Sequence, residues 1–314
     1  MGEMVDGAWR TDEDLAHAEG GQFKRPPTRF RGTIAAGGPH PPAANRYHLY
    51  VSLACPWAHR ALIARHLKGL DDMVGLSVTH WLMREQGWTF APGPGVVDDP
   101  FGAQLLQDVY RRADPRYSGR VTVPVLWDLE AGTIVNNESA DILRIFGSAF
   151  DAIGARPLDL YPEAFRPEID AVNARIYETL NNGVYRAGFA TTQEAYEAAV
   201  VPLFDTLDWL EARLSRERYL CGPAATEADW RLFTTLVRFD AVYHGHFKCN
   251  LRPLTAYPAL WDYARHLFQQ PGIRDTVDLE HIKGHYYGSH RAINPTGIVP
   301  RGPLLDWDAP PSRP

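Results

Sequence analysis

Cysteine is scarce in this chain, since only three of its 314 residues are cysteines. Three thiols cannot build a disulfide framework, and a chain of this length buries enough surface to fold without one. Long apolar runs are absent as well, because no stretch approaches the roughly 18 residues that a membrane helix needs. The N-terminal stretch MGEMVDGAWRTDEDLAHAEG is acidic and lacks the apolar centre of a secretory signal. These absences predict a cytoplasmic protein with reduced thiols and no membrane partner.

An excess of charge of one sign is also missing. Lys and Arg number 32 against 38 Asp and Glu, which gives a net charge of −6, and both signs are mixed along the chain. A basic surface for nucleic acid is therefore not expected. The hydrophobic content of 45% is that of an ordinary globular protein and excludes a disordered chain.

Composition and periodicity divide the chain into three parts. Residues 1–46 are rich in Pro, Gly and Ala without a sustained period, which predicts an N-terminal extension. Residues 47–150 predict a strand, a helix and a strand, then a long insert at 82–119 with one short helix, then two strands and a helix. This βαβ-ββα order is typical of an α/β sandwich rather than a doubly wound sheet.

The second half of the chain has a different character. Residues 160–314 carry apolar residues at helical spacing and offer no strand, which predicts an all-helical second domain with a C-terminal extension. The stretch TEAD, from Thr226 to Asp229, has the pattern of a capped helix N-terminus. Pro202 predicts either a kink or the start of a second helix.

Cys55 lies at the junction between the first strand and the first helix of the α/β domain, in the stretch VSLACPWAHRALIARHLKG. A thiol at a helix N-terminus meets unpaired N–H groups and the positive end of the helix dipole, which favour the thiolate. Pro56 suits the first helical turn, where a missing N–H costs nothing. A buried cysteine at an ordinary turn is the alternative. Position 58 is Ala, so the motif is not Cys-x-x-Cys, and a disulfide at Cys55 needs an outside thiol to resolve it.

Two further motifs follow where a peptide-like ligand would meet such a core. In TVPV, a cis Val123–Pro124 bond would leave the Val123 backbone available to a ligand, and a plain edge proline is the alternative. In NES, Glu138 and Ser139 stand at a helix start. There they would receive the ammonium and carboxylate of an amino-acid-like ligand, or simply cap the helix.

Together with the helical second half, these motifs resemble the glutathione transferase superfamily, and more closely its Xi class, the glutathionyl-hydroquinone reductases. The resemblance runs from about residue 45 through LACPWAHR, EQGWTF, DPRYSGRVTVPVLWD, NNESADILRIF, NNGVYRAGFA, TEADWRLFTTLVRFDAVYHGHFKCN and IKGHYYGSH. It implies a thioredoxin-like domain that binds glutathione as co-substrate, followed by an all-α substrate domain. The extension and the insert are also typical of this class, and a two-fold homodimer is implied.

The resemblance also implies roles for individual residues. Cys55 would be the nucleophile and Tyr185 the proton donor. Tyr243 and Tyr286 would assist ionisation of the cysteine, although Tyr287 leaves open which phenol reaches the site. Glutathione would be held by Trp88, Arg120, Val121, Thr122, Val123, Glu138 and Ser139.

The expected reaction is attack of the Cys55 thiolate on the sulfur of a glutathionyl-hydroquinone. A mixed disulfide between the enzyme and glutathione forms, and the hydroquinone leaves. A second glutathione then attacks the mixed disulfide and leaves as oxidised glutathione. A transferase that only conjugates would instead need Ser or Tyr at position 55 to hold the thiolate of glutathione.

Other interpretations remain open at this point. A dehydroascorbate reductase or a reductive dehalogenase would keep Cys55, but the phenol cluster favours an aromatic substrate. A binding module without activity would not need that cysteine. HGHFKC, with His244, His246 and Cys249, matches no common zinc spacing, so no metal is expected.

Overall fold

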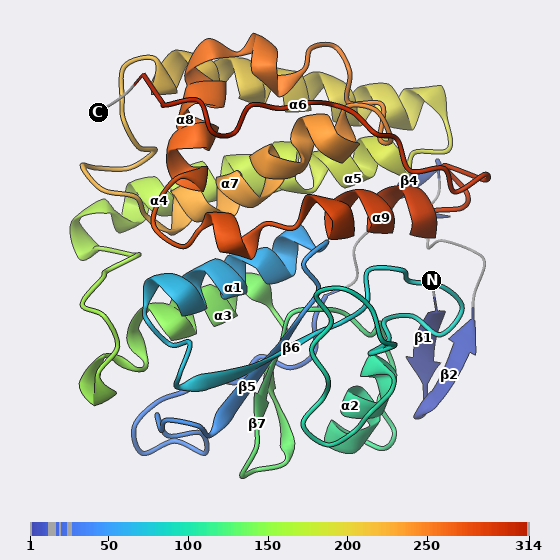
Figure 1. Ribbon diagram of the computed structural model, residues 1–314, viewed down its shortest axis with the longest axis vertical. Coiled ribbons are helices and arrows are strands. Elements are labelled where there is room, and N and C mark those ends of the chain that lie inside the picture. Colours follow the sequence, from blue (N-terminus) through green and yellow to red (C-terminus); the bar gives the residue numbers. More distant parts are fainter. Residues whose placement is uncertain (1, 12–16, 19, 24–26, 313–314) are drawn as a thin grey trace. The chain divides into compact units, whose positions relative to one another are not determined.

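The structure is a computed structural model that describes residues 2–11, 17–18, 20–23 and 27–312 (Figure 1). It contains two compact units. The N-terminal unit comprises Met1–Leu15 and Pro26–Asp159, and the C-terminal unit comprises Ala16–Arg25 and Leu160–Pro314. The sequence did not predict that a short piece of the extension joins the helical half.

A four-stranded sheet with the order β6-β5-β7-β8 forms the centre of the N-terminal unit. Its strands are β5 (Tyr47–Val51), β6 (Val74–Val78), β7 (Val125–Asp128) and β8 (Thr133–Asn136). β5 pairs in parallel with β6 and antiparallel with β7, and β7 pairs antiparallel with β8. All residues of β5 are buried, as expected of a central strand that is covered on both faces.

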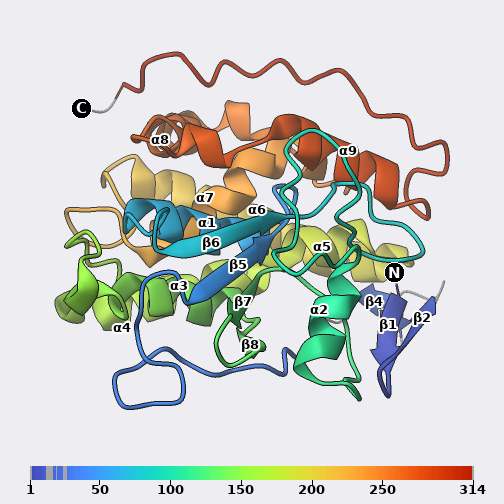
Figure 2. The same cartoon turned by 60° about the horizontal axis from the view of Figure 1, so that its bottom comes forward.

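The same unit contains helices α1 (Pro56–Leu67), α2 (Leu106–Ala113) and α3 (Ser139–Ser148). A short helical turn, η1 (Asp151–Ile153), follows α3. α1 and α3 pack against each other and lie side by side in Figure 1. α2 belongs to the insert and contacts β8, and Figure 2 shows it beside that strand. The predicted βαβ-ββα order is confirmed.

The N-terminal extension, for which the sequence predicted no strand, contains a hairpin of β1 (Gly2–Val5) and β2 (Ala8–Thr11). Asp6 and Gly7 form its turn with φ of 47° and 78°, the positive values that a two-residue hairpin turn requires. The backbones of Met4 and Gly119 exchange two hydrogen bonds of 2.9 Å. The hairpin therefore fastens the far end of the insert.

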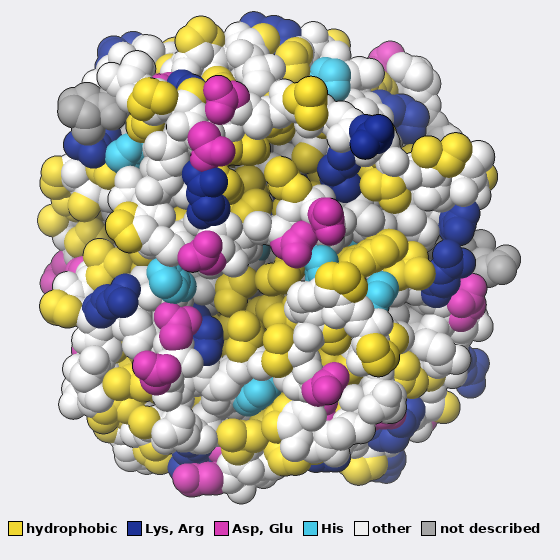
Figure 3. All heavy atoms as spheres, viewed as in Figure 1, with side chains coloured by type: hydrophobic (Ala, Val, Ile, Leu, Met, Phe, Trp, Pro, Cys, Tyr) yellow, Lys and Arg dark blue, Asp and Glu magenta, His cyan; other side chains and the backbone are white. Residues whose placement is uncertain are grey.

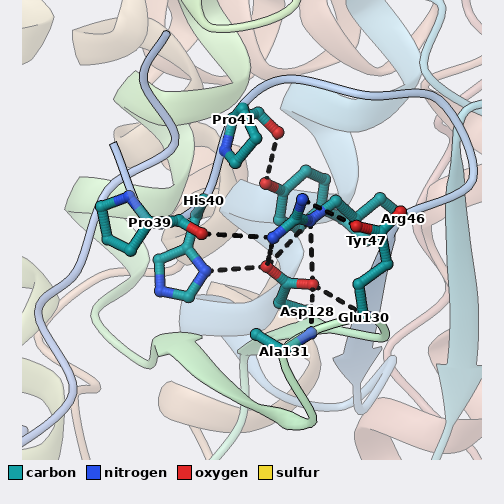
Figure 4. Close-up of polar contacts among 8 residues, drawn as sticks. All are labelled: Pro39, His40, Pro41, Arg46, Tyr47, Asp128, Glu130 and Ala131. Atoms are coloured by element: carbon teal, nitrogen blue, oxygen red, sulfur yellow. Dashed lines mark hydrogen bonds and ion pairs between the residues drawn. The ribbon is translucent and has the colours of Figure 1, made fainter. Parts of the chain in front are cut away.

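A buried carboxylate fastens the chain before β5 to the end of β7 (Figure 4). The Asp128 side chain has no exposed surface, and its Oδ2 accepts a hydrogen bond of 2.7 Å from Arg46. The backbone N–H groups of Glu130 and Ala131 donate to its Oδ1 at 3.0 Å, and His40 Nδ1 lies 2.8 Å from Oδ2. Burial acts to raise the pKa of Asp128, but the hydrogen bonds outweigh it and hold this pKa below its usual range.

Helices dominate the C-terminal unit. They are α4 (Arg166–Ile176), α5 (Gly183–Gly188), α6 (Gln193–Leu214), α7 (Glu227–Arg238), α8 (Pro258–Phe268) and α9 (Leu279–Ser289). Shorter helical turns are η2 (Glu163–Phe165), η3 (Tyr177–Asn181), η4 (Phe239–Tyr243), η5 (Leu254–Ala256) and η6 (Arg274–Thr276). A small ladder of β3 (His17–Ala18) and β4 (Gln22–Phe23) comes from the extension. The prediction of an all-helical second half is confirmed for its described residues.

Two local predictions in this half have different outcomes. Thr226 caps α7, and the capping box with Asp229 is present. Pro202 lies inside α6, so no second helix begins there.

The surface agrees with the mixed charge pattern of the sequence. Figure 3 shows acidic and basic side chains interspersed on one face of the molecule. Within the described parts of the chain, no helix combines the length and the apolar character that crossing a bilayer demands.

Candidate active site

Cys55 is the residue immediately before α1, with Pro56 at the first helical position. Its backbone is extended, its carbonyl accepts the N–H of His59 at 3.0 Å, and its side chain is partly exposed. The predicted placement of a thiol at a helix N-terminus is therefore present, and that placement stabilises a thiolate.

The other two cysteines have the opposite surroundings. Cys221 and Cys249 are fully buried. Burial raises the pKa of Cys221 to about 12 and raises the pKa of Cys249 further above its usual range. Buried thiols of this kind are inert, so Cys55 is the thiol suited to chemistry.

The segment before β7 lies next to this cysteine. The Val123–Pro124 peptide bond is cis. Cys55 Sγ lies 3.7 Å from the carbonyl oxygen of Val123, within reach of a weak S–H hydrogen bond. The structure therefore brings together two of the residues that the sequence singled out.

Two phenols hold the same segment from one side. The Tyr117 hydroxyl donates to the carbonyl of Arg120 at 2.9 Å. The Tyr110 hydroxyl donates to the carbonyl of Thr122 at 2.8 Å and accepts its N–H at 3.3 Å. These two phenols therefore fix the backbone on both sides of Val121.

Glu138 and Ser139 stand at the start of α3, as predicted. Glu138 is the N-cap residue, and its side chain accepts the N–H of Ala140 at 3.3 Å. Thr28 Oγ1 lies 3.4 Å from the same carboxylate, and Ser139 is buried. The capping role is thus observed, and it leaves the carboxylate half-buried at a helix N-terminus beside Asn137.

Trp88 lies in the insert and is largely buried, with 7% of its surface exposed. Its carbonyl accepts the N–H of Leu106 at 3.0 Å, which joins it to the start of α2. The ring of Trp9 from the hairpin lies close against the preceding residue, Gly87, and Trp9 Nε1 donates to Glu85 O at 2.8 Å. The insert and the extension therefore position this tryptophan together.

The three predicted tyrosines meet in the C-terminal unit. The hydroxyl of Tyr286 lies 2.5 Å from that of Tyr185 and 3.0 Å from that of Tyr243. Tyr243 and Tyr286 are buried, and Tyr185 is half-buried. Burial, reinforced by the neighbouring phenols, raises the pKa of Tyr243 and of Tyr286 well above the usual range. Both hydroxyls therefore stay protonated at neutral pH and can donate hydrogen bonds.

The structure also resolves which of the two adjacent tyrosines belongs to this cluster. Tyr286 makes both phenol contacts, whereas the ring of the half-buried Tyr287 packs against His246 with centroids 4.8 Å apart. Phe247 packs against Tyr185, Tyr243 and Tyr286 with ring centroids 5.4–5.6 Å apart. The sequence did not single out this phenylalanine.

The histidines near the phenols form a buried pair. His246 Nε2 lies 3.2 Å from His290 Nδ1. Burial lowers the pKa of His246 to about 4 and that of His290 well below its usual range, so both are neutral. Among the residues that the structure describes, no group of three or more His, Cys, Asp or Glu side chains is placed to hold a metal ion.

Tyr110, Tyr117 and Trp9 are the contributors that sequence reasoning missed. Tyr110 and Tyr117 lie within the insert, where the sequence predicted only one short helix, and their partners come from other segments. The Asp-Gly pair at residues 6–7 was the one local signal of the hairpin that carries Trp9.

Comparison with known proteins gives concordant results. The family model for the N-terminal domain of glutathione S-transferases matches residues 54–149, and the model for the C-terminal domain matches residues 193–266. Glutathionyl-hydroquinone reductase PcpF of Sphingobium chlorophenolicum is 57% identical over 304 residues, which cover 96% of each chain. Glutathionyl-hydroquinone reductase YqjG of Escherichia coli K12 is 50% identical and covers 100% of this chain and 98% of its own.

Solved structures agree with these relatives. The glutathione-bound structure of YqjG matches with a TM-score of 0.90 at 49% identity, over 99% of both chains. A Xi class transferase from Natrialba magadii matches with a TM-score of 0.94 at 48% identity, over 100% of this chain and 96% of its own. The chain belongs to the glutathionyl-hydroquinone reductases, the Xi class of the glutathione transferase family.

Proposed function

We propose that this protein reduces glutathionyl-hydroquinones to hydroquinones at the expense of glutathione. The observation that carries the proposal is a partly exposed cysteine before α1, 3.7 Å from the Val123 carbonyl. The names of PcpF and YqjG support the same activity. Cysteine is decisive because a thiolate at this position forms a covalent bond to the glutathione sulfur, whereas Ser or Tyr would only bind it.

We propose that residues of the N-terminal unit bind glutathione. In this proposal the N–H of Val123, which makes no hydrogen bond within the described residues, pairs with the peptide backbone of glutathione. Glu138 and Ser139 receive the γ-glutamyl end at the N-terminus of α3, and Trp88 with the Arg120–Val123 segment holds the remainder. The glutathione-bound structure of YqjG supports such a site.

The reaction has two steps that balance. First, the Cys55 thiolate attacks the sulfur of the substrate, so that a sulfur–sulfur bond forms while the ring carbon–sulfur bond breaks. The ring carbon keeps the electron pair and takes up a proton. Second, a glutathione thiolate attacks the mixed disulfide, oxidised glutathione leaves and the Cys55 thiolate returns. The hydroquinone ring gains one hydrogen, and two glutathionyl groups become one disulfide.

Tyr185 is the proposed acid for the ring carbon. Its half-buried hydroxyl is bonded to that of Tyr286, whose own proton is retained because its pKa is raised. A phenolate left at Tyr185 after proton donation would accept a hydrogen bond from Tyr286, which lowers the cost of giving up the proton. Tyr243 backs Tyr286 at 3.0 Å, and we also propose that these two phenols favour the thiolate of Cys55.

Steady-state turnover on three substrates tests the proposed activity. We expect release of free hydroquinone from a glutathionyl-hydroquinone in the presence of glutathione, and much slower turnover of dehydroascorbate and of chlorinated hydroquinones. Cys55→Ala should lower turnover by about a thousandfold or more. The matched control Cys221→Ala should stay within about twofold, because its buried thiol is inert. Preferred turnover of dehydroascorbate would assign the chain to the other reductase class.

We also propose a cytoplasmic location and a two-fold homodimer. No disulfide joins any of the three cysteines, which suits the glutathione-rich cytoplasm. A two-fold homodimer stays a prediction from the family, and light scattering that gives the 35.2-kDa mass of one chain would contradict it. No nucleic-acid or membrane partner is proposed.

A further inference from the structure

Helix α2 of the insert touches three of the segments that the proposed function assigns to glutathione. At its start, the N–H of Leu106 donates to the carbonyl of Trp88 at 3.0 Å. One turn later, the hydroxyl of Tyr110 reaches both Thr122 and Asn137. Since the insert is not part of the βαβ-ββα core, these contacts give it a role in the site that its position in the sequence does not reveal.

The Tyr110 hydroxyl has every hydrogen-bonding position filled. It donates to Thr122 O at 2.8 Å, accepts Thr122 N–H at 3.3 Å and accepts Asn137 Nδ2–H at 3.1 Å. A phenol has one proton to give and two lone pairs, so this set is complete. Tyr110 is fully buried, and its ring packs on Tyr117 and Phe30 with centroids 5.0 and 6.1 Å away.

The pairing with Thr122 determines which main-chain groups face a ligand. The N–H of Thr122 donates to Tyr110 and its C=O accepts from Tyr110, so the Thr122 N–H is not available to a peptide ligand. The N–H groups of Val121 and Val123 make no hydrogen bond within the described residues. Tyr110 thus fixes the register in which this segment meets glutathione.

The hydrogen bond from Asn137 also links Tyr110 to the turn before α3. Asn137 Oδ1 accepts the N–H of Phe30 at 3.2 Å, and the Asn137 N–H donates to Phe30 O at 3.1 Å. Asn137 directly precedes Glu138 and Ser139, so its orientation sets where these two side chains begin. One hydroxyl therefore joins the two segments that would grip opposite parts of a tripeptide.

We propose that Tyr110 is a positioning residue for glutathione, which acts by locking the Arg120–Val123 segment to the turn before α3. This inference rests on the proposed function, because it assumes that glutathione binds these two segments. It assigns no chemistry to Tyr110, which contacts the binding segments rather than the reacting sulfur.

The test compares Tyr110→Phe with Tyr47→Phe. Both changes remove one buried phenol hydroxyl in the same unit, but the Tyr47 hydroxyl donates to Pro41 O at 2.7 Å, away from the binding segments. Glutathione affinity is measured by titration calorimetry, and KM and kcat are measured with glutathionyl-hydroquinone. We expect Tyr110→Phe to weaken glutathione binding about tenfold and to raise KM more than it lowers kcat. Tyr47→Phe should leave both within twofold.

Hydrogen exchange shows whether the change is confined to the segment that Tyr110 holds, while the split between KM and kcat separates positioning from a purely structural role. In Tyr110→Phe, exchange at the Thr122 amide should accelerate while exchange in β5 stays unchanged. Unchanged glutathione affinity in a folded Tyr110→Phe protein would overturn the inference. Should that variant not fold, Asn137→Ala, which loses the link to Tyr110, must show the same selective loss of affinity. A wild type that binds glutathione but does not turn over the hydroquinone would refute the proposed function and leave this inference standing.

Discussion

Position 55 shows how a single side chain directs the chemistry of this site. The helix N-terminus and the Val123 carbonyl would surround any residue placed there. A hydroxyl in that position would bind the glutathione thiolate and activate it, whereas a thiolate becomes the nucleophile itself. Cys221 and Cys249 make the contrast within the same chain, because burial raises the pKa of each thiol and keeps it protonated.

The adjacent tyrosines 286 and 287 offer a matched pair of variants. Tyr286→Phe removes the hydroxyl that joins Tyr185 and Tyr243, so we expect kcat to fall about tenfold through loss of support for the acid. Tyr287→Phe removes a hydroxyl outside this cluster from a ring that packs against His246, and kcat should change less than about twofold. Equal effects of the two changes on kcat would contradict the assignment of Tyr286.

Elements whose signals are local were predictable from the sequence. Cys55-Pro56 and Thr226–Asp229 each combine a cap residue with a suitable first turn, and helices α1 and α7 begin there. The hold of Tyr110 on Thr122 and Asn137 was not predictable, since it joins residues 12 and 27 positions apart through an insert without regular pattern. Tyr110 is buried by segments that are distant in the sequence, so its sequence neighbours do not reveal its burial.

At the end of strand β7, Asp128 supports a prediction about stability. Asp128→Asn should lower the free energy of unfolding at pH 7, because it removes the buried charge that accepts hydrogen bonds from Arg46 and from the N–H groups of Glu130 and Ala131. Asp208→Asn, which removes an exposed ion pair with Arg252, should change it by no more than about 0.5 kcal/mol. Urea denaturation of the two variants and the wild type measures both values.

The contribution of the Asp128–Arg46 pair to the free energy of unfolding depends on pH, and the sign of that dependence follows from the pKa of Asp128. The folded pKa of Asp128 is lowered, so its contribution is full above the unfolded pKa of about 3.9 and is lost as the pH falls through the folded value. The difference in stability between wild type and Asp128→Asn should therefore narrow below about pH 4. A difference that stays constant from neutral to acidic pH would show that the carboxylate charge contributes nothing.

At the scale of the whole molecule, segments outside the common α/β core hold residues that the proposed function assigns to glutathione. The hairpin holds Gly119 through Met4, and Trp9 lies against Gly87, next to Trp88. Helix α2 holds the Thr122 segment. In the proposed function, the nucleophile and the glutathione contacts come from the N-terminal unit and the phenols come from the C-terminal unit. The family resemblance predicts which residues form the site, but the contacts through which the extension and the insert hold them join segments far apart in the sequence and have no local signal.

The proposed reaction requires that Cys55 takes the glutathionyl group from the substrate. Mass spectrometry after mixing the protein with one equivalent of glutathionyl-hydroquinone, without added glutathione, tests it directly. We predict a single glutathionyl adduct on Cys55, release of one hydroquinone, and loss of the adduct on adding glutathione. An unmodified Cys55, or an adduct that retains the aromatic ring, would contradict the account.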